Sequence, residues 1–241
     1  MPASPSRRPE PAPADPRLIV ALDLPTRAQA EAMVEALGDA ASFYKIGLQL
    51  LADGGMGLAR DLKGAGLRVF LDWKLHDIGA TVERAAAAIV ASGACDFLTV
   101  HAEPQVLAAA VRGRAGERSV KILGVTVLTS LSAQDLGEIG YGLSVRPLVE
   151  RRIGQARDAG ADGVVASPLE AALARRLGGP GFLVATPGVR PAGASLDDQA
   201  RAAAPAEALA AGASHLVVGR PITAAPDPRA AALAIAREMA G

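Results

Sequence analysis

Three charged residues, Asp72, Lys74 and Asp77, stand close together after an apolar run in segment 69–79. The run predicts a buried strand, and side chains alternate faces along a strand, so Asp72 and Lys74 should point the same way. Burying an unpaired charge is costly, so an acid and a lysine on the inward face indicate either a catalytic pair or a structural ion pair. Asp77 falls just beyond the strand, on the loop that follows.

Lys45 is a second lysine in apolar surroundings, within segment 43–47. It could snorkel out at the strand edge. If it faces inward instead, it joins Asp72, Lys74 and Asp77 in a set of cations and anions whose charges cancel. A lysine between two acids lowers their affinity for a hard cation, which needs several oxygen ligands. The chain has 3 histidines without ligand-like spacing, so a metal-free site is favoured.

Two later loops have the composition of a phosphate site. One contains Pro187, Gly188 and Arg190, and the other contains Gly219 and Arg220. Glycines let backbone N–H groups approach an anion, and arginines supply positive charge. We therefore expect phosphate binding here rather than two plain turns with surface arginines. The small, polar segment 192–199 between these loops could close as a lid or could be an ordinary surface loop.

Short apolar runs alternate along the chain with longer amphipathic stretches. The runs predict strands at 18–24, 43–47, 68–74, 97–101, 121–128, 163–167, 182–186 and 215–219. The stretches predict helices near 27–37, 54–65, 80–92, 104–112, 145–159, 168–177, 198–211 and 227–239. Strand–helix alternation implies a parallel sheet, and this number of units in 241 residues predicts an α/β fold, a closed (β/α)8 TIM barrel.

The predicted barrel can be checked against the positions of the polar residues. Barrel enzymes carry their chemistry at the C-terminal ends of the strands. In this chain those ends hold Asp23, Lys45, Asp72 with Lys74, His101, Thr129 with Ser130, Ser167 and the two phosphate loops. Three further residues, two histidines and the single tryptophan, are assigned structural roles. His76 and His101 fit structural hydrogen bonding at least as well as catalysis, and Trp73 should pack outward between strand and helix.

Composition limits the cellular setting and the partners. The 25 basic and 25 acidic residues cancel and aromatics make up 3% of the chain, so we expect no nucleic-acid partner and no membrane surface. The single cysteine, Cys95, excludes an internal disulfide and suits a reducing cytosol. Residues 1–16 are proline-rich and lack an apolar signal-peptide core, so we expect a disordered tail followed by one barrel domain over 17–241 and a cytoplasmic location.

Several short motifs together resemble the orotidine 5′-phosphate decarboxylase family, over the whole chain from about Leu18. The central one is Asp72-x-Lys74-x-x-Asp77-Ile78 with Leu75-His76 inside it. The others are Leu22-Asp23, Tyr44-Lys45-Ile46-Gly47, Val127-Leu128-Thr129-Ser130, Pro187-Gly188-Val189-Arg190 with Gln199 nine residues on, and Val218-Gly219-Arg220-Pro221. The resemblance implies cofactor-free decarboxylation of orotidine 5′-monophosphate to uridine 5′-monophosphate (UMP), in de novo pyrimidine biosynthesis.

The resemblance also implies a role for each matched residue. Lys74 would protonate the pyrimidine carbon that loses carbon dioxide, Asp72 would lie near the substrate carboxylate, and Asp77 would act in the partner subunit's site of a homodimer. The substrate would be bound through Asp23 and Lys45 at the ribose, Thr129 and Ser130 at the pyrimidine, Gln199 between base and phosphate, and Arg190, Gly219 and Arg220 at the phosphate. Thr81 and Pro187 complete the expected substrate-binding set.

The chain departs from the usual family pattern in two places, one of which is the closing-loop segment, which is rich in alanine and glycine. The other is the motif after Asp77-Ile78. Gly79-Ala80-Thr81 stands where many members have Pro-Asn-Thr, so a hydrogen bond from the Asn side chain is lost although Thr81 is kept. The nearest alternative is a magnesium-dependent relative that acts on a sugar phosphate and shares the Asp-x-Lys-x-x-Asp core. A barrel that binds a phosphorylated ligand without turnover is a second alternative, which the intact Lys and Asp set disfavours.

Overall fold

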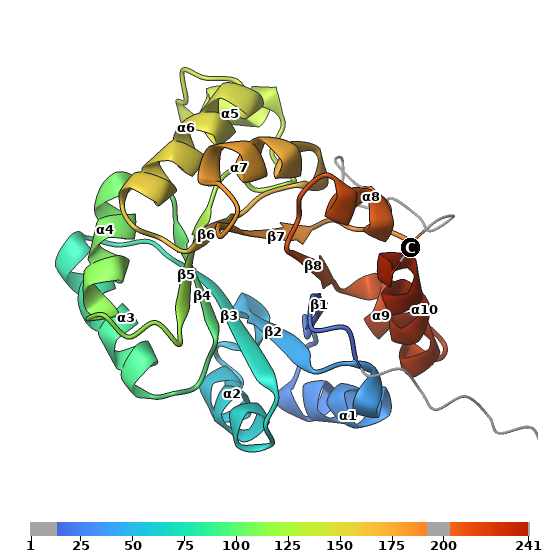
Figure 1. Ribbon diagram of the computed structural model, residues 1–241. Coiled ribbons are helices and arrows are strands. Elements are labelled where there is room, and N and C mark those ends of the chain that lie inside the picture. The colour runs from blue at the N-terminus through green and yellow to red at the C-terminus, as the bar shows by residue number, and fades with distance from the viewer. Residues whose placement is uncertain (1–13, 192–202, 241) are drawn as a thin grey trace, which may run out of the picture.

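The computed structural model describes residues 14–191 and 203–240. These residues form a closed barrel in which every neighbouring pair of strands is parallel, with the strands ordered β1 to β8 around the ring and the helices outside it (Figure 1). The predicted (β/α)8 fold is therefore confirmed. Residues 1–13 of the expected tail and 198–202 of an expected helix lie outside the described residues.

The strands lie within the predicted runs or extend one residue beyond them. Their bounds are β1 (Leu18–Ala21), β2 (Phe43–Gly47), β3 (Arg68–Leu75), β4 (Phe97–His101), β5 (Lys121–Val125), β6 (Gly163–Val165), β7 (Leu183–Pro187) and β8 (His215–Val218). Four of the runs, those of β1, β5, β6 and β8, continue past the strand into the loop at its C-terminal end. Those extra residues lie at the mouth of the barrel, where the polar side chains gather.

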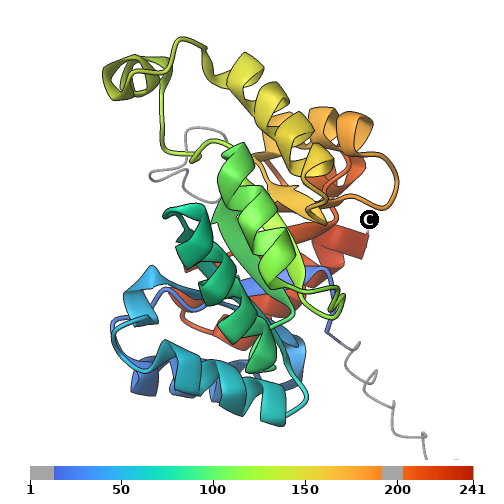
Figure 2. The ribbon, with the colours of Figure 1, turned by 90° about the vertical axis from the view of Figure 1, so that its left-hand side faces the viewer.

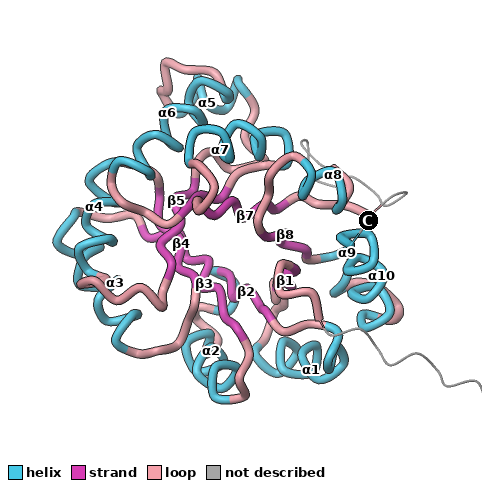
Figure 3. The backbone as a smooth tube through the Cα atoms, viewed as in Figure 1, coloured by secondary structure: helices cyan, strands magenta, loops and turns pink. Residues whose placement is uncertain are grey.

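The helices form the outer ring, which Figure 3 shows in cyan around the magenta strands. They are α1 (Arg27–Leu37), α2 (Gly55–Gly64), α3 (Gly79–Ala91), α4 (Pro104–Gly113), α5 (Ala133–Ile139), α6 (Val145–Asp158), α7 (Ala171–Gly178), α8 (Pro205–Ala210), α9 (Arg220–Thr223) and α10 (Pro228–Ala240). Helix α10 packs beside α1 and so closes the ring. The short helices α5 and α9 were not expected from the sequence. No helix of the described ranges has both the length and the apolar character needed to span a membrane.

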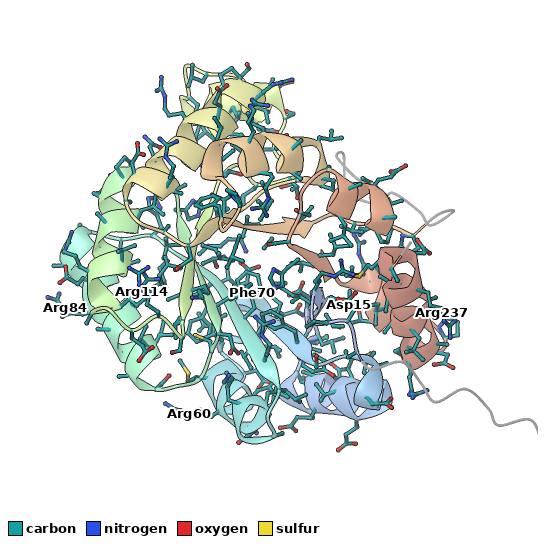
Figure 4. All side chains as sticks on the ribbon, in the orientation of Figure 1. Asp15, Arg60, Phe70, Arg84, Arg114 and Arg237 are labelled. Atoms are coloured by element: carbon teal, nitrogen blue, oxygen red, sulfur yellow. The ribbon has the colours of Figure 1, made fainter. Side chains whose placement is uncertain are left out.

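Strand alternation divides the core into two layers. One layer fills the barrel with alternate side chains, among them Phe43, Phe70 and Phe97, whose rings meet edge to face at centroid distances of 5.1 and 5.8 Å. Figure 4 shows Phe70 in the middle of the strand ring, whereas Arg60 and Arg84 lie on the outer rim. The larger layer lies between strands and helices. Trp73 packs against that layer, as predicted.

Strand β3 is irregular where the charged motif begins. Leu71 pairs with Leu98 of β4, but the next pair is Leu75 with Val100, so the register shifts between them. Lys74 lies in this irregular stretch and has a φ of 49°, in the left-handed region that residues other than glycine rarely adopt. The bulge therefore redirects the chain next to the cluster of charges.

Helix α5 stands out from the barrel in the connection between β5 and α6 (Figure 2). Ser132 caps it, in a capping box with Asp135. The buried Arg152 of α6 anchors this connection: its guanidinium donates to the Thr126 carbonyl, to Glu103 Oε1 at 2.6 Å and to the Tyr141 hydroxyl at 2.7 Å. These bonds fix both ends of the segment that carries the predicted pyrimidine-binding residues.

Candidate active site

A cavity of about 450 Å³ opens at the C-terminal ends of the strands. This is the end at which barrel enzymes place their chemistry. One part of the lining is charged and comes from β2, β3 and the segment just after β1, and another comes from β7 and the loops after β7 and β8. The rest of the lining is a largely apolar wall that includes Phe70, Val125, Val127, Val165 and Val217. The volume lies within the range of small-molecule sites.

Four charged side chains form a continuous chain along the first part of the lining. Lys45 Nζ lies 2.8 Å from Asp23 Oδ1 and 3.4 Å from Asp72 Oδ2. Asp72 Oδ1 in turn accepts a hydrogen bond from Lys74 Nζ at 2.9 Å. Cations and anions therefore alternate from Asp23 to Lys74, and each central charge has partners on both sides.

Burial makes these pairings strong. The side chains of Lys45 and Asp72 are only 9% and 13% exposed. Burial alone would lower the pKa of Lys45, but Asp72 and Asp23 outweigh it and hold that pKa above its usual value. Burial alone would raise the pKa of Asp72, but Lys45 and Lys74, helped by a hydrogen bond from Thr99, keep it below its usual value. Both groups are therefore ionised at neutral pH.

The glycine–arginine loops lie at the same cavity. Gly188 has a φ of 78°, a conformation that favours glycine. Pro187, Gly188, Arg190, Gly219 and Arg220 all line the cavity, as predicted. Arg190 is buried, and one of its terminal nitrogens donates to the Val189 carbonyl at 3.1 Å. Its buried Nε has no partner within the described part of the chain. The loops thus bring two guanidinium groups to one region.

Several predicted site residues are not brought to this cavity. Asp77 is exposed and its carboxylate accepts a hydrogen bond from the Ile78 N–H at 2.6 Å. Thr81 lies in the first turn of α3, and Ser130 is exposed beside Thr129, which does line the cavity. Gln199 lies outside the described residues. The single chain therefore assembles the Asp23–Lys45–Asp72–Lys74 part of the expected network without Asp77.

The two histidines near the site belong to a neighbouring cluster. The rings of His76 and His101 lie 4.9 Å apart, and His76 Nε2 is 3.8 Å from Glu103 Oε2. Burial, with smaller contributions from nearby charges, lowers the pKa of His101, although Glu103 opposes this. Neither ring lines the main cavity. Their surroundings suit the structural role that the sequence favoured.

Sequence reasoning missed Thr99, which is fully buried on β4 and bonded to both members of the Asp72–Lys74 pair. It also missed Thr223 at the end of α9, which lines the cavity. A signal for Thr99 existed, since it lies two residues before His101 on the same predicted strand and so shares its face. No group of three or more His, Cys, Asp or Glu residues in the described ranges is placed to hold a metal ion.

Fold and site together define a class of protein. A (β/α)8 barrel whose mouth carries alternating lysines and aspartates together with two glycine–arginine loops is an enzyme-type barrel suited to a small anionic, phosphorylated molecule. The first group combines both signs of charge, whereas the second is positive, and both line the same cavity.

Comparison with known proteins narrows this class to one family. The family model described as "Orotidine 5'-phosphate decarboxylase / HUMPS family" matches residues 16–235, and the chain belongs to that family. The family expected from the motifs is thus confirmed.

The relatives agree along almost the full length. Proteins named orotidine 5′-phosphate decarboxylase from Caulobacter sp. (strain K31) and Caulobacter vibrioides (strain NA1000 / CB15N) are 67% and 66% identical, and each match covers 95% of this chain and 99% of the relative. The crystal structure of orotidine 5′-phosphate decarboxylase from Lactobacillus acidophilus has a TM-score of 0.83 at 38% identity, covering 94% of this chain and all of that one.

Proposed function

We propose that this chain decarboxylates orotidine 5′-monophosphate to UMP in pyrimidine biosynthesis, with Lys74 as the proton donor. The reaction is the one for which the relatives are named, and it makes the chain a carboxy-lyase. The observation that carries the residue assignment is the 2.9 Å contact of Lys74 Nζ with the ionised Asp72 at the cavity wall. That contact holds an ammonium group in a position where negative charge can develop.

The chemistry requires strong electrostatic help. When the substrate carboxylate leaves as carbon dioxide, the electron pair of the broken bond stays on an sp² ring carbon that has no electron sink. A preorganised ammonium stabilises that charge and then transfers its proton to the carbon. Lys74 carries out both steps in this proposal and recovers its proton from solvent. Asp72 holds it in place, and Lys45 keeps Asp72 ionised.

The shape of the cavity supports one orientation of the substrate. The phosphate binds between Arg190 and Arg220, where the backbone of Gly188 and Gly219 can approach it closely. The ribose then lies against Asp23 and Lys45, and the pyrimidine faces the apolar wall near Thr129. Gln199 contacts base and phosphate in this proposal. Phosphate binding far from the reacting carbon contributes to alignment there.

A homodimer completes the site in this proposal. Asp77 and the adjacent Ile78, which is 71% exposed, form an outward-facing pair at the mouth of the barrel. Across a two-fold axis, Asp77 of each chain enters the partner's site and becomes the fourth charge around Lys74. Exposed Leu48 and Leu51, 56% and 49% exposed, supply apolar surface near the same mouth. Thr81 and Ser130 remain substrate-binding residues in this proposal, with Ser130 at the pyrimidine.

The proposed enzyme works in the cytoplasm without metal, cofactor or nucleic acid. Its two aspartate–lysine contacts support the metal-free part, because Asp23 and Asp72 each already have a lysine partner. The balanced charge of the chain supports the absence of a nucleic-acid partner.

Ultraviolet absorbance of orotidine 5′-monophosphate tests the proposal directly. Purified protein should remove the orotate chromophore at the same rate with and without EDTA. No loss of the chromophore would contradict the reaction. Loss only in the presence of magnesium would contradict the metal-free site and turn attention to sugar phosphates as substrates.

A further inference from the structure

Thr99 lies directly beneath the catalytic pair, at the point where β3 leaves its regular register. The ladder passes from Leu71 opposite Leu98 to Leu75 opposite Val100. Between these pairs, the three residues 72–74 of β3 face a single residue of β4, which is Thr99. The bulge therefore gives β3 two more residues than β4 over this stretch, and both charged side chains come from the bulged part.

The Thr99 hydroxyl contacts both charged residues. Its Oγ1 accepts a hydrogen bond from the Lys74 backbone N–H at 3.0 Å and donates one to Asp72 Oδ1 at 3.0 Å. Thr99 is completely buried, so water cannot replace either bond. A bulged residue has no normal ladder partner, and a buried N–H group without a partner is destabilising. The hydroxyl provides the acceptor that the ladder lacks at this residue.

The charges fix the direction of both bonds. Asp72 lies between two lysines and is ionised, so its oxygens can only accept. The single hydroxyl proton of Thr99 must therefore point to Asp72, which leaves an oxygen lone pair for the Lys74 N–H. One small side chain thus connects the backbone of the lysine with the carboxylate that its own ammonium contacts.

The backbone of Lys74 is the feature that needs this support. Its φ of 49° is unfavourable for a residue with a β-carbon, and only Ala115 shares a positive φ among the non-glycine residues of the described ranges. Such a conformation persists when the surrounding structure fixes it, and it is often found at functional sites. The bond from Lys74 N–H to Thr99 is a direct restraint on that conformation.

We propose that Thr99 is a positioning residue for the decarboxylation: it holds the bulge of β3 so that the Lys74 ammonium and the Asp72 carboxylate face the reacting carbon in fixed geometry. The inference rests on the proposed role of Lys74. Thr99 itself touches no substrate, because it lies below the charged pair and does not line the cavity. Its loss should therefore reduce the rate of the chemical step and leave substrate binding nearly intact.

Thr99→Val tests the role, because valine keeps the shape of threonine and removes the hydroxyl. We expect kcat to fall by about 10²-fold, as for a misplaced catalytic group, with KM changed by less than about threefold. Thr99→Ser restores the hydroxyl and should keep kcat within about threefold of wild type. The acidic limb of the kcat profile should move to higher pH in Thr99→Val, because the carboxylate has lost a donor.

Thr186→Val is the matched control. Thr186 is also a fully buried strand threonine near the mouth of the barrel, but its hydroxyl has no hydrogen-bond partner in the described residues. Its replacement should leave kcat and KM unchanged. Thr99→Ala serves as a second hydroxyl-free variant if Thr99→Val does not fold by circular dichroism.

The results separate this inference from the proposed function. An inactive wild-type protein contradicts the function itself. With active wild type, the positioning role is overturned if a folded hydroxyl-free variant keeps kcat within about threefold, if KM alone rises, or if Thr99→Ser loses as much activity as Thr99→Val. A large fall in kcat that serine rescues supports it.

Discussion

The carboxylate of Asp23 lies so close to Gly47 that no side chain fits at position 47 unless the carboxylate moves. A β-carbon built on Gly47 would lie 2.5 Å from Asp23 Oδ1 and 3.1 Å from Lys45 Nζ. Gly47 ends β2, two residues after Lys45 on the same strand, and its φ is not in the left-handed region. Glycine is therefore needed at position 47 because it has no side chain, and the Asp23–Lys45 ion pair occupies the space that a β-carbon would fill.

Gly47→Ala should displace the Asp23 carboxylate and break the end of the charged chain. We expect kcat/KM for orotidine 5′-monophosphate to fall by about 10- to 100-fold, because Asp23, the proposed ribose-binding group, is misplaced. Steady-state kinetics measures this loss. The matched control is Gly154→Ala in the middle of α6, where a β-carbon meets nothing within 4 Å. That variant should keep full activity and gain about 0.5–1 kcal/mol of stability. Equal activity of the two variants would refute the spatial argument.

The architecture of the barrel was predictable because its signals are local. Apolar runs bounded by turn residues gave every strand, and the charges inside those runs gave Lys45, Asp72 and Lys74. The loops with Arg190 and Arg220 were predictable for the same reason: their residue types identify them without knowledge of contacts. Helix α5 was missed although Ser132 and Asp135 form a capping pair, because its seven residues carry only one buried side chain, Leu136.

The geometry that tunes the site was not predictable from those signals. Alternation predicts that Asp72 and Lys74 share a face, and they do meet, but no hydrophobic pattern reveals the register shift between β3 and β4. Alternation places Thr99 on the same face as His101, but its contact with both Asp72 and Lys74 depends on that shift, which the pattern does not reveal. Asp77 presents the opposite case. Its motif is plain in the sequence, yet one chain gives it no contact with Lys74, since the expected contact needs a second subunit.

Lys74→Ala should abolish turnover and leave the fold intact. Under the proposed mechanism the variant lacks both the charge that stabilises the carbanion and the proton that quenches it, so kcat should fall by at least about 10³-fold. Lys121→Ala is a suitable control, because Lys121 begins β5 at the opposite end of the barrel and its ammonium donates to the Arg118 carbonyl at 2.7 Å. Near-wild-type turnover by a folded Lys74→Ala protein would exclude Lys74 as the proton donor.

Mixing two inactive variants should restore activity if the site is shared. In a hybrid of Lys74→Ala and Asp77→Ala chains, one site carries both substitutions and the other carries neither. Random exchange makes half of the dimers hybrids, so about a quarter of wild-type activity per site should return. Subunit exchange is followed by native mass spectrometry while the orotate absorbance is recorded. Confirmed hybrids without recovered activity would show that Asp77 does not cross the interface.

His215 should make folding stability depend on pH. It lies at the N-terminal end of the barrel, with its ring centroid 5.0 Å from that of Phe97, and burial is the largest cause that lowers its pKa to about 4. The charged groups that act on it are Arg68, Asp15 and Arg17; the two arginines lower the pKa further and Asp15 opposes them.

The sign of the effect follows from this lowered pKa. His215 takes up a proton below about pH 6.5 in the unfolded chain but only near pH 4 in the folded protein. The contribution of neutral His215 to the free energy of unfolding is therefore complete above pH 6.5 and is lost as the pH falls from 6.5 to 4. The loss amounts to roughly 3 kcal/mol. Urea unfolding of wild type and His215→Phe at several pH values in this range should show a shallower dependence in the variant. His76→Phe is the control, because the side chain of His76 is 56% exposed. An unchanged slope in His215→Phe, or an equal reduction in both variants, would contradict the assignment.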